Sequence, residues 1–287
     1  MFNDPYTAHV HAVDTLTAAG IPAPVEWAAL RTRFSDAVEA ASVDDTVTRA
    51  AAALIDGDDP ATVQSLWALA AGQAAATSIH RATVANGVRA AVLRRLYALY
   101  EPTAGDNWTA AADLFDKAAA AFTKAADTVD PEAPATAVMG EPEKVRKAWT
   151  EAEFLVHDID AAIPVLSAAA ALCGIPADGS RESAVALTLD TTGHKRRYVW
   201  TAWETTGTRC GRWSALHAAG VTLRAARTAE DAAPYRKPKP VETRQVPVGR
   251  GRWEYREIDP EDEFEAPASA PAPTITLDPD AVELTAH

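Results

Sequence analysis

The chain has 287 residues and a formal net charge of −13, with 48% hydrophobic and 23% charged residues. That composition is typical of a soluble globular protein, and no run reaches the ~18–20 large apolar residues that a membrane span requires. The N-terminus has neither the basic nor the apolar segment of a secretory signal, so we expect a cytoplasmic protein. The two cysteines form no Cys-x-x-Cys pair, which favours free thiols over a disulfide in that reducing compartment.

Charge is distributed along the chain in three blocks. Residues 1–180 contain 12 basic and 24 acidic side chains, residues 181–256 contain 15 basic and 7 acidic ones, and residues 257–287 contain 9 acidic ones and no basic one. Four of the eight Trp residues lie in the basic block. We therefore predict three parts, which are an acidic antiparallel bundle of Ala-rich helices over 1–176, a small basic module containing β-hairpins over 180–258, and an extended acidic tail over 259–287.

Helical signals open the first block. Asp4 and Pro5 are suited to the N-cap and first turn of a helix over 4–19. Gly20 is suited to the position just after that helix, where a left-handed backbone is common. A second helix is predicted to begin near Pro24, because apolar residues recur there at spacings of three and four.

A long apolar stripe covers residues 60–100, where the sequence has no proline after the first position. It predicts one long helix that closes at Pro102 and Gly105. Asn86-Gly87 is the most plausible place for a kink, because glycine costs roughly 1 kcal/mol relative to alanine inside a helix.

The clearest periodicity lies over 108–129, where bulky and small residues alternate at steps of three and four. Such a heptad seam lets a partner helix approach closely. A last long helix is predicted from 143 to 173, with a kink or a new start at Pro164. The residues that we expect to pack in these seams are Trp108, Phe115, Phe122, Val145, Trp149 and Val156.

The basic block begins with strand-like patterns. Residues 184–189 and 198–203 alternate with a period of two around a glycine-containing turn, which predicts a β-hairpin. The segment 213–226 fits a helix or a strand. A second hairpin is predicted over 241–258, with its turn at 249–251. Because an isolated hairpin is marginally stable in water, we expect this module to pack on itself or on the helices.

Catalytic and metal-binding motifs are absent from the sequence pattern. His9 and His11 would share a face only on a strand, and we predict a helix there. Glu153 and His157 are four residues apart, whereas the di-iron motif requires Glu and His three apart, and twice. No phosphate-binding loop, dinucleotide fingerprint or nucleophile elbow is present. We therefore expect no enzyme activity, no metal and no cofactor.

The basic module is the candidate binding surface. Its Arg and Lys side chains suit either phosphates or an acidic protein surface, including the chain's own tail, and its aromatic residues could stack on bases. We predict protein–protein contact or neutralisation within the chain, with nucleic-acid binding as the alternative. The residues in this set are Lys195, Arg196, Arg197, Trp200, Arg209, Arg212, Arg236, Lys237, Lys239, Arg250, Arg252 and Trp253.

Two resemblances extend these expectations. The excess of Arg over Lys, with heavy use of Ala, Thr, Asp and Val, resembles the composition of proteins from actinobacteria and their phages. Tyr97 with Glu101, and Tyr255 with Asp259, resemble the Tyr-x-x-x-Asp/Glu signal of type VII secretion substrates, which are helical hairpins. From the helical seams, the charge blocks and the tail we predict a non-enzymatic structural or assembly protein, as in a phage virion or its assembly. A nucleic-acid-binding accessory protein and a type VII-associated helical protein are the alternatives.

Overall fold

The computed structural model describes residues 4–42, 53, 55, 59–75, 78–233, 235–247 and 253–261. Within these ranges the protein is mainly helical and has two small antiparallel strand pairs, as predicted. The helices are α1 (Pro5–Ala18), α2 (Val25–Ser42), α4 (Pro60–Ala75), α5 (Ser78–Ala126), α6 (Ala135–Val138), α7 (Glu143–Leu172), α8 (Arg181–Thr188), α9 (Arg196–Trp203) and α10 (Gly211–Ala218). The strands are β1 (Leu189–Asp190), β2 (Thr222–Leu223), β3 (Glu242–Pro247) and β4 (Trp253–Ile258).

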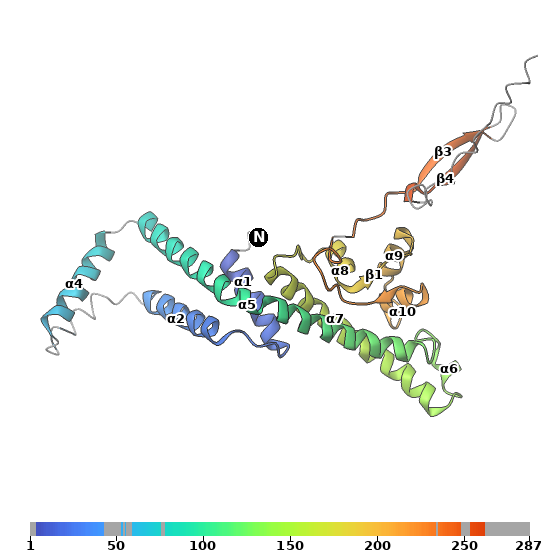
Figure 1. Cartoon of the computed structure of the whole chain (residues 1–287), viewed down its shortest axis with the longest axis horizontal. Helices are drawn as coiled ribbons and strands as arrows, with labels where there is room; N and C mark the ends of the chain where they lie inside the picture. The colour runs from blue at the N-terminus through green and yellow to red at the C-terminus, as the bar shows by residue number, and fades with distance from the viewer. Residues whose placement is uncertain are drawn as a thin grey trace, which may run out of the picture.

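Helices α5 and α7 form the antiparallel pair around which the other elements are arranged (Figure 1). Trp108, Phe115 and Phe122 of α5 are buried, and α7 contributes Ile159 and Leu166 to the same core. Three further residues of the predicted seam are half-buried along α7, namely Val145, Trp149 and Val156. The alternation of bulky and small side chains thus packs two helices of the same chain against each other.

Helix α1 begins where the sequence predicts. The side chain of Asp4 accepts a hydrogen bond from the backbone N–H of Thr7 at 3.2 Å, and Pro5 occupies the first turn. Gly20 has φ 86°, a left-handed conformation in which glycine is favoured. The helix packs along α7 and α5, while α2 packs along α5.

The stripe over 60–100 is not one helix. Helix α4 ends at Ala75 and α5 begins at Ser78, whereas Asn86 and Gly87 lie within the uninterrupted α5. The helix is therefore not interrupted at Asn86-Gly87, where the sequence predicts a kink. Glycine at an exposed helical position costs only about 1 kcal/mol, which a helix as long as α5 tolerates.

The predicted end of this helix at Pro102 and Gly105 is also wrong, because α5 continues through both residues. Leu96, Tyr100 and Trp108 lie on one face at multiples of four residues, and all three are buried. A proline inside a helix costs roughly 3 kcal/mol, and fully burying a large apolar side chain contributes about 1.5–3 kcal/mol. Burial on both sides of Pro102 therefore holds the helix together.

The first predicted hairpin is wrong as well, because residues 184–189 and 198–203 lie mainly in helices α8 and α9. The hydroxyl of Ser180 caps α8 by accepting from the N–H of Ser183 at 3.2 Å. Helix α8 is buried on nearly all sides, so its apolar residues carry no helical period. Over so few residues a buried helix and a strand give similar patterns.

The ambiguous segment 213–226 contains the end of α10 and the short strand β2, which pairs with β1. The second predicted hairpin is confirmed, since β3 and β4 pair antiparallel from Glu242↔Ile258 to Pro247↔Trp253. Its turn at 249–251 and the tail beyond residue 261 lie outside the described residues. Helices α8, α9 and α10 share one continuous hydrophobic core with α5 and α7.

Candidate interaction surfaces

Arginines of the basic block form ion pairs with carboxylates of the same chain. Their partners lie on α5 and α7 of the bundle as well as within the block. The nitrogen–oxygen distances are 3.3 Å for Arg209–Glu153, 2.7 Å for Arg227–Asp113, 3.0 Å for Arg181–Glu204 and 3.9 Å for Arg224–Asp190. Much of the positive charge that the sequence offers to a partner is thus compensated within the fold.

A further five charged side chains form a compact group, which we call the carboxylate clasp: Arg196, Arg197, Arg236, Asp259 and Glu261. Glu261 lies at its centre and is only 3% exposed. Arg236 donates to both of its carboxylate oxygens, at 2.8 and 2.7 Å, and Arg196 donates to one of them at 3.1 Å. Bidentate arginine–carboxylate pairs of this kind are among the strongest charge-assisted hydrogen bonds in proteins.

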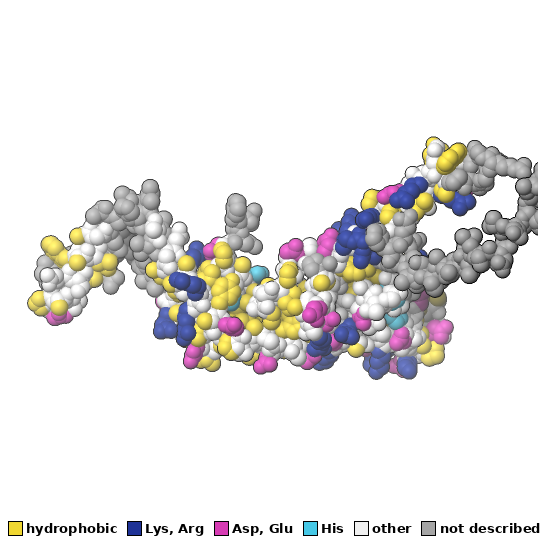
Figure 2. Space-filling view, turned by 45° about the horizontal axis from the view of Figure 1, so that its top comes forward, with side chains coloured by type: hydrophobic (Ala, Val, Ile, Leu, Met, Phe, Trp, Pro, Cys, Tyr) yellow, Lys and Arg dark blue, Asp and Glu magenta, His cyan; other side chains and the backbone are white. Residues whose placement is uncertain are grey.

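The clasp fastens the base of the β3–β4 hairpin to α9. Arg197 donates to Asp259 at 2.7 Å, just after β4, and also donates to the carbonyl of Lys239, just before β3. The N–H of Lys239 in turn donates to Glu261 at 2.8 Å. Figure 2 shows basic side chains gathered at this base. The two carboxylates therefore hold both ends of the hairpin against one helix.

The clasp also changes the acidity of its carboxyl groups. The hydrogen bond from Arg197 lowers the pKa of Asp259 to about 2. The hydrogen bonds from Arg236 and from the Lys239 N–H lower the pKa of Glu261 to about 2. Both groups consequently stay ionised at every pH at which a cell operates. The sequence predicts that the acidic segment could neutralise the basic module, and the clasp contains contacts of that kind.

Arg209 and Arg212 from the predicted binding set lie against tryptophan rings. The Arg209 guanidinium is 3.7 Å from the ring centroid of Trp149 and donates to the carbonyl of Pro131 at 3.1 Å. Arg212 lies 4.9 Å from the centroid of Trp203. These cation–π contacts join the basic block to the bundle and to itself.

The tryptophans of the basic block divide between core and surface. Trp200, Trp203 and Trp213 are buried, and Trp213 donates to Asp160 of α7 at 3.0 Å. Trp253 on β4 is 63% exposed, and it lies across the hairpin from Pro247. Lys195, Lys237 and Lys239 are exposed, whereas Arg250 and Arg252 lie outside the described residues.

Helix α4 forms a second surface, which we call the uncharged arm. Its sequence contains no Asp, Glu, Lys or Arg, and no other described helix or strand packs along it. It lies at the end of the molecule farthest from the β3–β4 hairpin (Figure 1). Trp67 is 61% exposed and Leu69 50% exposed. The missing charges are the signal by which the sequence could have identified this surface.

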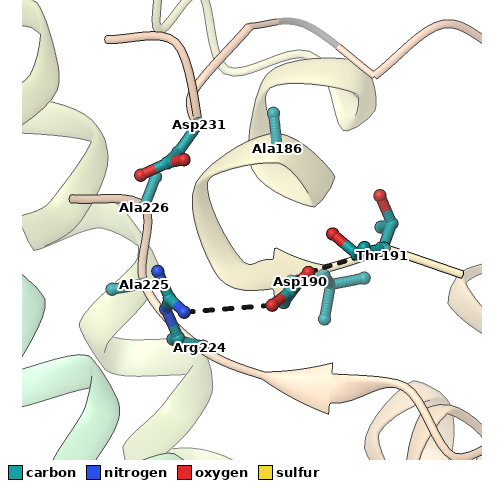
Figure 3. A pocket seen from close by; sticks show the side chains of 9 residues that line it. Ala186, Asp190, Thr191, Arg224, Ala225, Ala226 and Asp231 are labelled. Carbon is teal, nitrogen blue, oxygen red and sulfur yellow. Dashed lines mark hydrogen bonds and ion pairs between the residues drawn. The ribbon is translucent and has the colours of Figure 1, made fainter. Parts of the chain in front are cut away.

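A polar cavity of about 200 Å³ lies between α8 and the segment after β2 (Figure 3). Asp190, Arg224 and Asp231 line it, and Asp190 is 3.9 Å from Arg224. Asp190 accepts from the N–H of Thr192 at 3.1 Å, and Asp231 accepts from the N–H of Thr228 at 3.1 Å. Both carboxylates therefore accept hydrogen bonds from the local backbone.

Metal-binding groups of three or more His, Cys, Asp or Glu do not occur among the described residues. His9 is buried in α1, and its Nε2 accepts from the indole N–H of Trp27 at 3.1 Å. By length and composition alone, α7 is the one described helix that could cross a membrane, and here it packs along α5.

The Tyr-x-x-x-Glu motif at Tyr97 lies within α5 and does not follow a helix end. The second copy begins at Tyr255 on β4. Comparison with known proteins found no matching family model, no matching curated protein and no matching solved structure.

Proposed function

We propose that this chain is a non-enzymatic structural protein that joins a larger assembly through the uncharged arm. The observation that carries the proposal is helix α4, with Trp67 and Leu69 exposed and no described element packed along it. On composition alone, we place that assembly in the virion of an actinobacteriophage or prophage, or in the pathway that builds the virion.

The uncharged arm exposes large apolar side chains to water and has no charged ones. Isolated helices shorter than about 12–15 residues are marginal in water, and most helices in proteins are stabilised by packing an apolar face. Helix α4, with 16 residues, is only just above that limit. A surface helix normally carries charged residues on its outer side, and α4 carries none. Burial of its apolar face against a partner would supply the missing stabilisation.

The internal ion pairs argue against the basic module as the main binding surface. A phosphate group or foreign carboxylate would have to displace Glu261 from Arg236, or Asp116 and Asp113 from Arg227. Each displacement gives up an existing charge-assisted bond and returns a carboxylate to water, so the net gain in binding free energy is small.

The test is affinity purification of the full chain from its native source, with Trp67→Glu as the variant. The wild-type chain should recover its assembly partners and the variant should lose them. Met139→Glu is the matched control, because Met139 is 69% exposed on the far side of the bundle, next to α6. A wild-type chain that stays monomeric at high concentration and recovers nothing would refute the proposal.

The second candidate is nucleic-acid binding by the β3–β4 hairpin. Trp253 and Tyr255 are both exposed on one face of the hairpin. Arg244 and Arg256 pair across the strands on the opposite face, where each also forms an ion pair with a glutamate of its own strand. Exposed aromatic rings can stack on single-stranded bases, and arginines on the same hairpin can attract the nucleic-acid backbone. Binding of short DNA that weakens steeply with salt, and that is lost in Trp253→Ala, would favour this candidate over assembly.

A further inference from the structure

The charge-free part of the chain is longer than helix α4 itself. Residues 60–79 contain no Asp, Glu, Lys or Arg, although the whole chain carries a net charge of −13. Most other segments of the protein contain charged residues, which would lie near any contact that those segments made. When two copies approach, this segment is where they can touch without bringing like charges together.

The position of the arm strengthens that argument. Arg89 of α5 is ion-paired with Asp4, the N-cap of α1, at 3.1 Å, and α5 begins 11 residues earlier at Ser78, which is about 16 Å farther out at ~1.5 Å per residue. The Debye length at physiological ionic strength is about 8 Å. Acidic bodies joined only at the ends of such arms are therefore largely screened from each other.

The apolar residues of α4 suit a helical partner. Val63, Leu66 and Trp67 lie at spacings of three and four, which places them on one face of the helix. Ala68 and Gly72 are exposed beside that face and leave room for a second backbone to approach. Among the described residues at this end, Figure 2 shows mainly hydrophobic and other uncharged side chains, with an acidic group at the tip and no basic ones.

Resting on the proposed function, we infer that the partner of the uncharged arm is the uncharged arm of a second copy of this chain. A two-fold axis would bring the same face of α4 from both copies together. Antiparallel pairing opposes the two helix dipoles favourably and sends the acidic bodies in opposite directions. A foreign partner attracted by the acidic body would find no charge on α4 to recognise.

The length of α4 sets the expected affinity of the dimer. Helix α4 has 16 residues and is about 24 Å long at ~1.5 Å per residue. One helix pair of that length buries less than a standard interface, which totals about 1,200–2,000 Å². We therefore expect a reversible dimer with a dissociation constant in the micromolar range.

Sedimentation velocity of the purified full chain, from below to above micromolar concentration, is the deciding experiment. The wild-type chain and the Met139→Glu control should shift from monomer to dimer, and Trp67→Glu should remain monomeric. Because Trp67 is exposed and outside the core, circular dichroism of this variant should match that of the wild-type chain.

Salt separates this contact from the docking of a basic module on a neighbour's acidic helices. Added salt should preserve or strengthen an arm-to-arm dimer, because it screens repulsion between the bodies, whereas it would weaken an electrostatic contact. A dimer that dissociates in salt or survives Trp67→Glu would overturn the inference. A purified chain that stays monomeric, yet captures another protein through Trp67, would overturn it while leaving the proposed function intact.

Discussion

At the scale of single residues, His9 shows how the fold changes the chemistry that a sequence suggests. In sequence it forms His-x-His with His11, a spacing that would suit a metal on a strand. In the structure it is buried between α1, α2 and α5, with its ring centroid 4.3 Å from that of Tyr97. Burial lowers its pKa to about 4. His9 is therefore a neutral hydrogen-bond acceptor for Trp27 at physiological pH.

This burial makes stability depend on pH. The unfolded chain takes up a proton on His9 near its ordinary pKa of 6.5, whereas the folded chain resists it until about 4. The contribution of His9 to the free energy of unfolding is therefore complete above pH 6.5. It declines as pH falls to 4, by about 3 kcal/mol at most. Urea denaturation at a series of pH values should show this decline.

His9→Gln is the control for that measurement, because glutamine can still accept from Trp27 and does not titrate. Its stability should change less than that of the wild-type chain between pH 6.5 and 4.5. Parallel curves for the two proteins would show that another group is responsible.

At the scale of elements, the carboxylate clasp decides where the β3–β4 hairpin lies. Trp253 and Tyr255 of this hairpin are exposed, and no other described helix or strand packs extensively on it. Its attachment therefore depends on ion pairs at its base more than on apolar contact. This is an unusual way to hold a two-stranded element, because such hairpins are marginal alone.

Glu261→Gln should loosen that attachment. The amide presents a single acceptor oxygen and no charge to Arg196 and Arg236, at an expected cost of about 1–2 kcal/mol because both arginines are partly exposed. Hydrogen exchange of the Lys239 amide, which donates to Glu261, should accelerate. Glu257→Gln, on the exposed surface of β4, should leave that exchange rate unchanged. Equal rates in the two variants would show that the clasp does not hold the hairpin.

The clasp has a pH dependence of its own. The pKa values of Asp259 and Glu261 are lowered from 3.8 and 4.5 to about 2. Their contribution to stability is therefore complete above pH 4.5 and is lost as pH falls toward 2.

Helix α5 allows a direct measurement of glycine's cost. Gly105 lies inside this helix, and a Cβ atom added there would meet nothing within 4 Å. Gly105→Ala should raise the free energy of unfolding by about 0.5–1 kcal/mol. Gly174→Ala should lower it by roughly 1–2 kcal/mol, because Gly174 has φ 74° after α7. Thermal denaturation would show whether each substitution raises or lowers stability. Destabilisation by Gly105→Ala would mean that α5 is irregular near Pro102.

At the scale of the whole molecule, the basic block and the helical bundle are stabilised by the same core. Trp213 of α10 lies 6.3 Å from Phe115 of α5 and 5.7 Å from Trp203 of α9, measured between ring centroids. Glu132, in the loop after α5, accepts from the N–H of Cys210 at 2.8 Å and caps α10. We expect the bundle and helices α8 to α10 to unfold in one transition.

Trp213→Ala tests that cooperativity. Loss of this buried side chain should lower the free energy of unfolding by roughly 3–5 kcal/mol. Guanidinium denaturation should still show one transition, with amides of α5 and α7 exchanging together with those of α10. Trp253→Ala should change stability by less than about 0.5 kcal/mol, since that ring is exposed. A separate early transition of residues 181–232 would contradict a shared core.

The sequence by itself determined the features that depend on neighbours in the chain. The cap at Asp4, the seam through Trp108, Phe115 and Phe122, and the hairpin over 241–258 all follow from local spacing and local backbone chemistry. Capping groups and the residue periods of helices and strands depend on residues that are close together in the chain, so they can be recognised without knowledge of the tertiary structure.

Tertiary structure decided the rest. Burial of Tyr100 and Trp108 carries α5 through Pro102, and burial on nearly all sides removes the helical period from α8. The pairing of Arg236 with Glu261 joins charges 25 residues apart, and no local pattern specifies which carboxylate an arginine will find. Charge counts alone therefore suggested a basic surface where folding produced a largely neutralised one. The exposure of α4 was likewise decided by what the rest of the chain leaves unpacked.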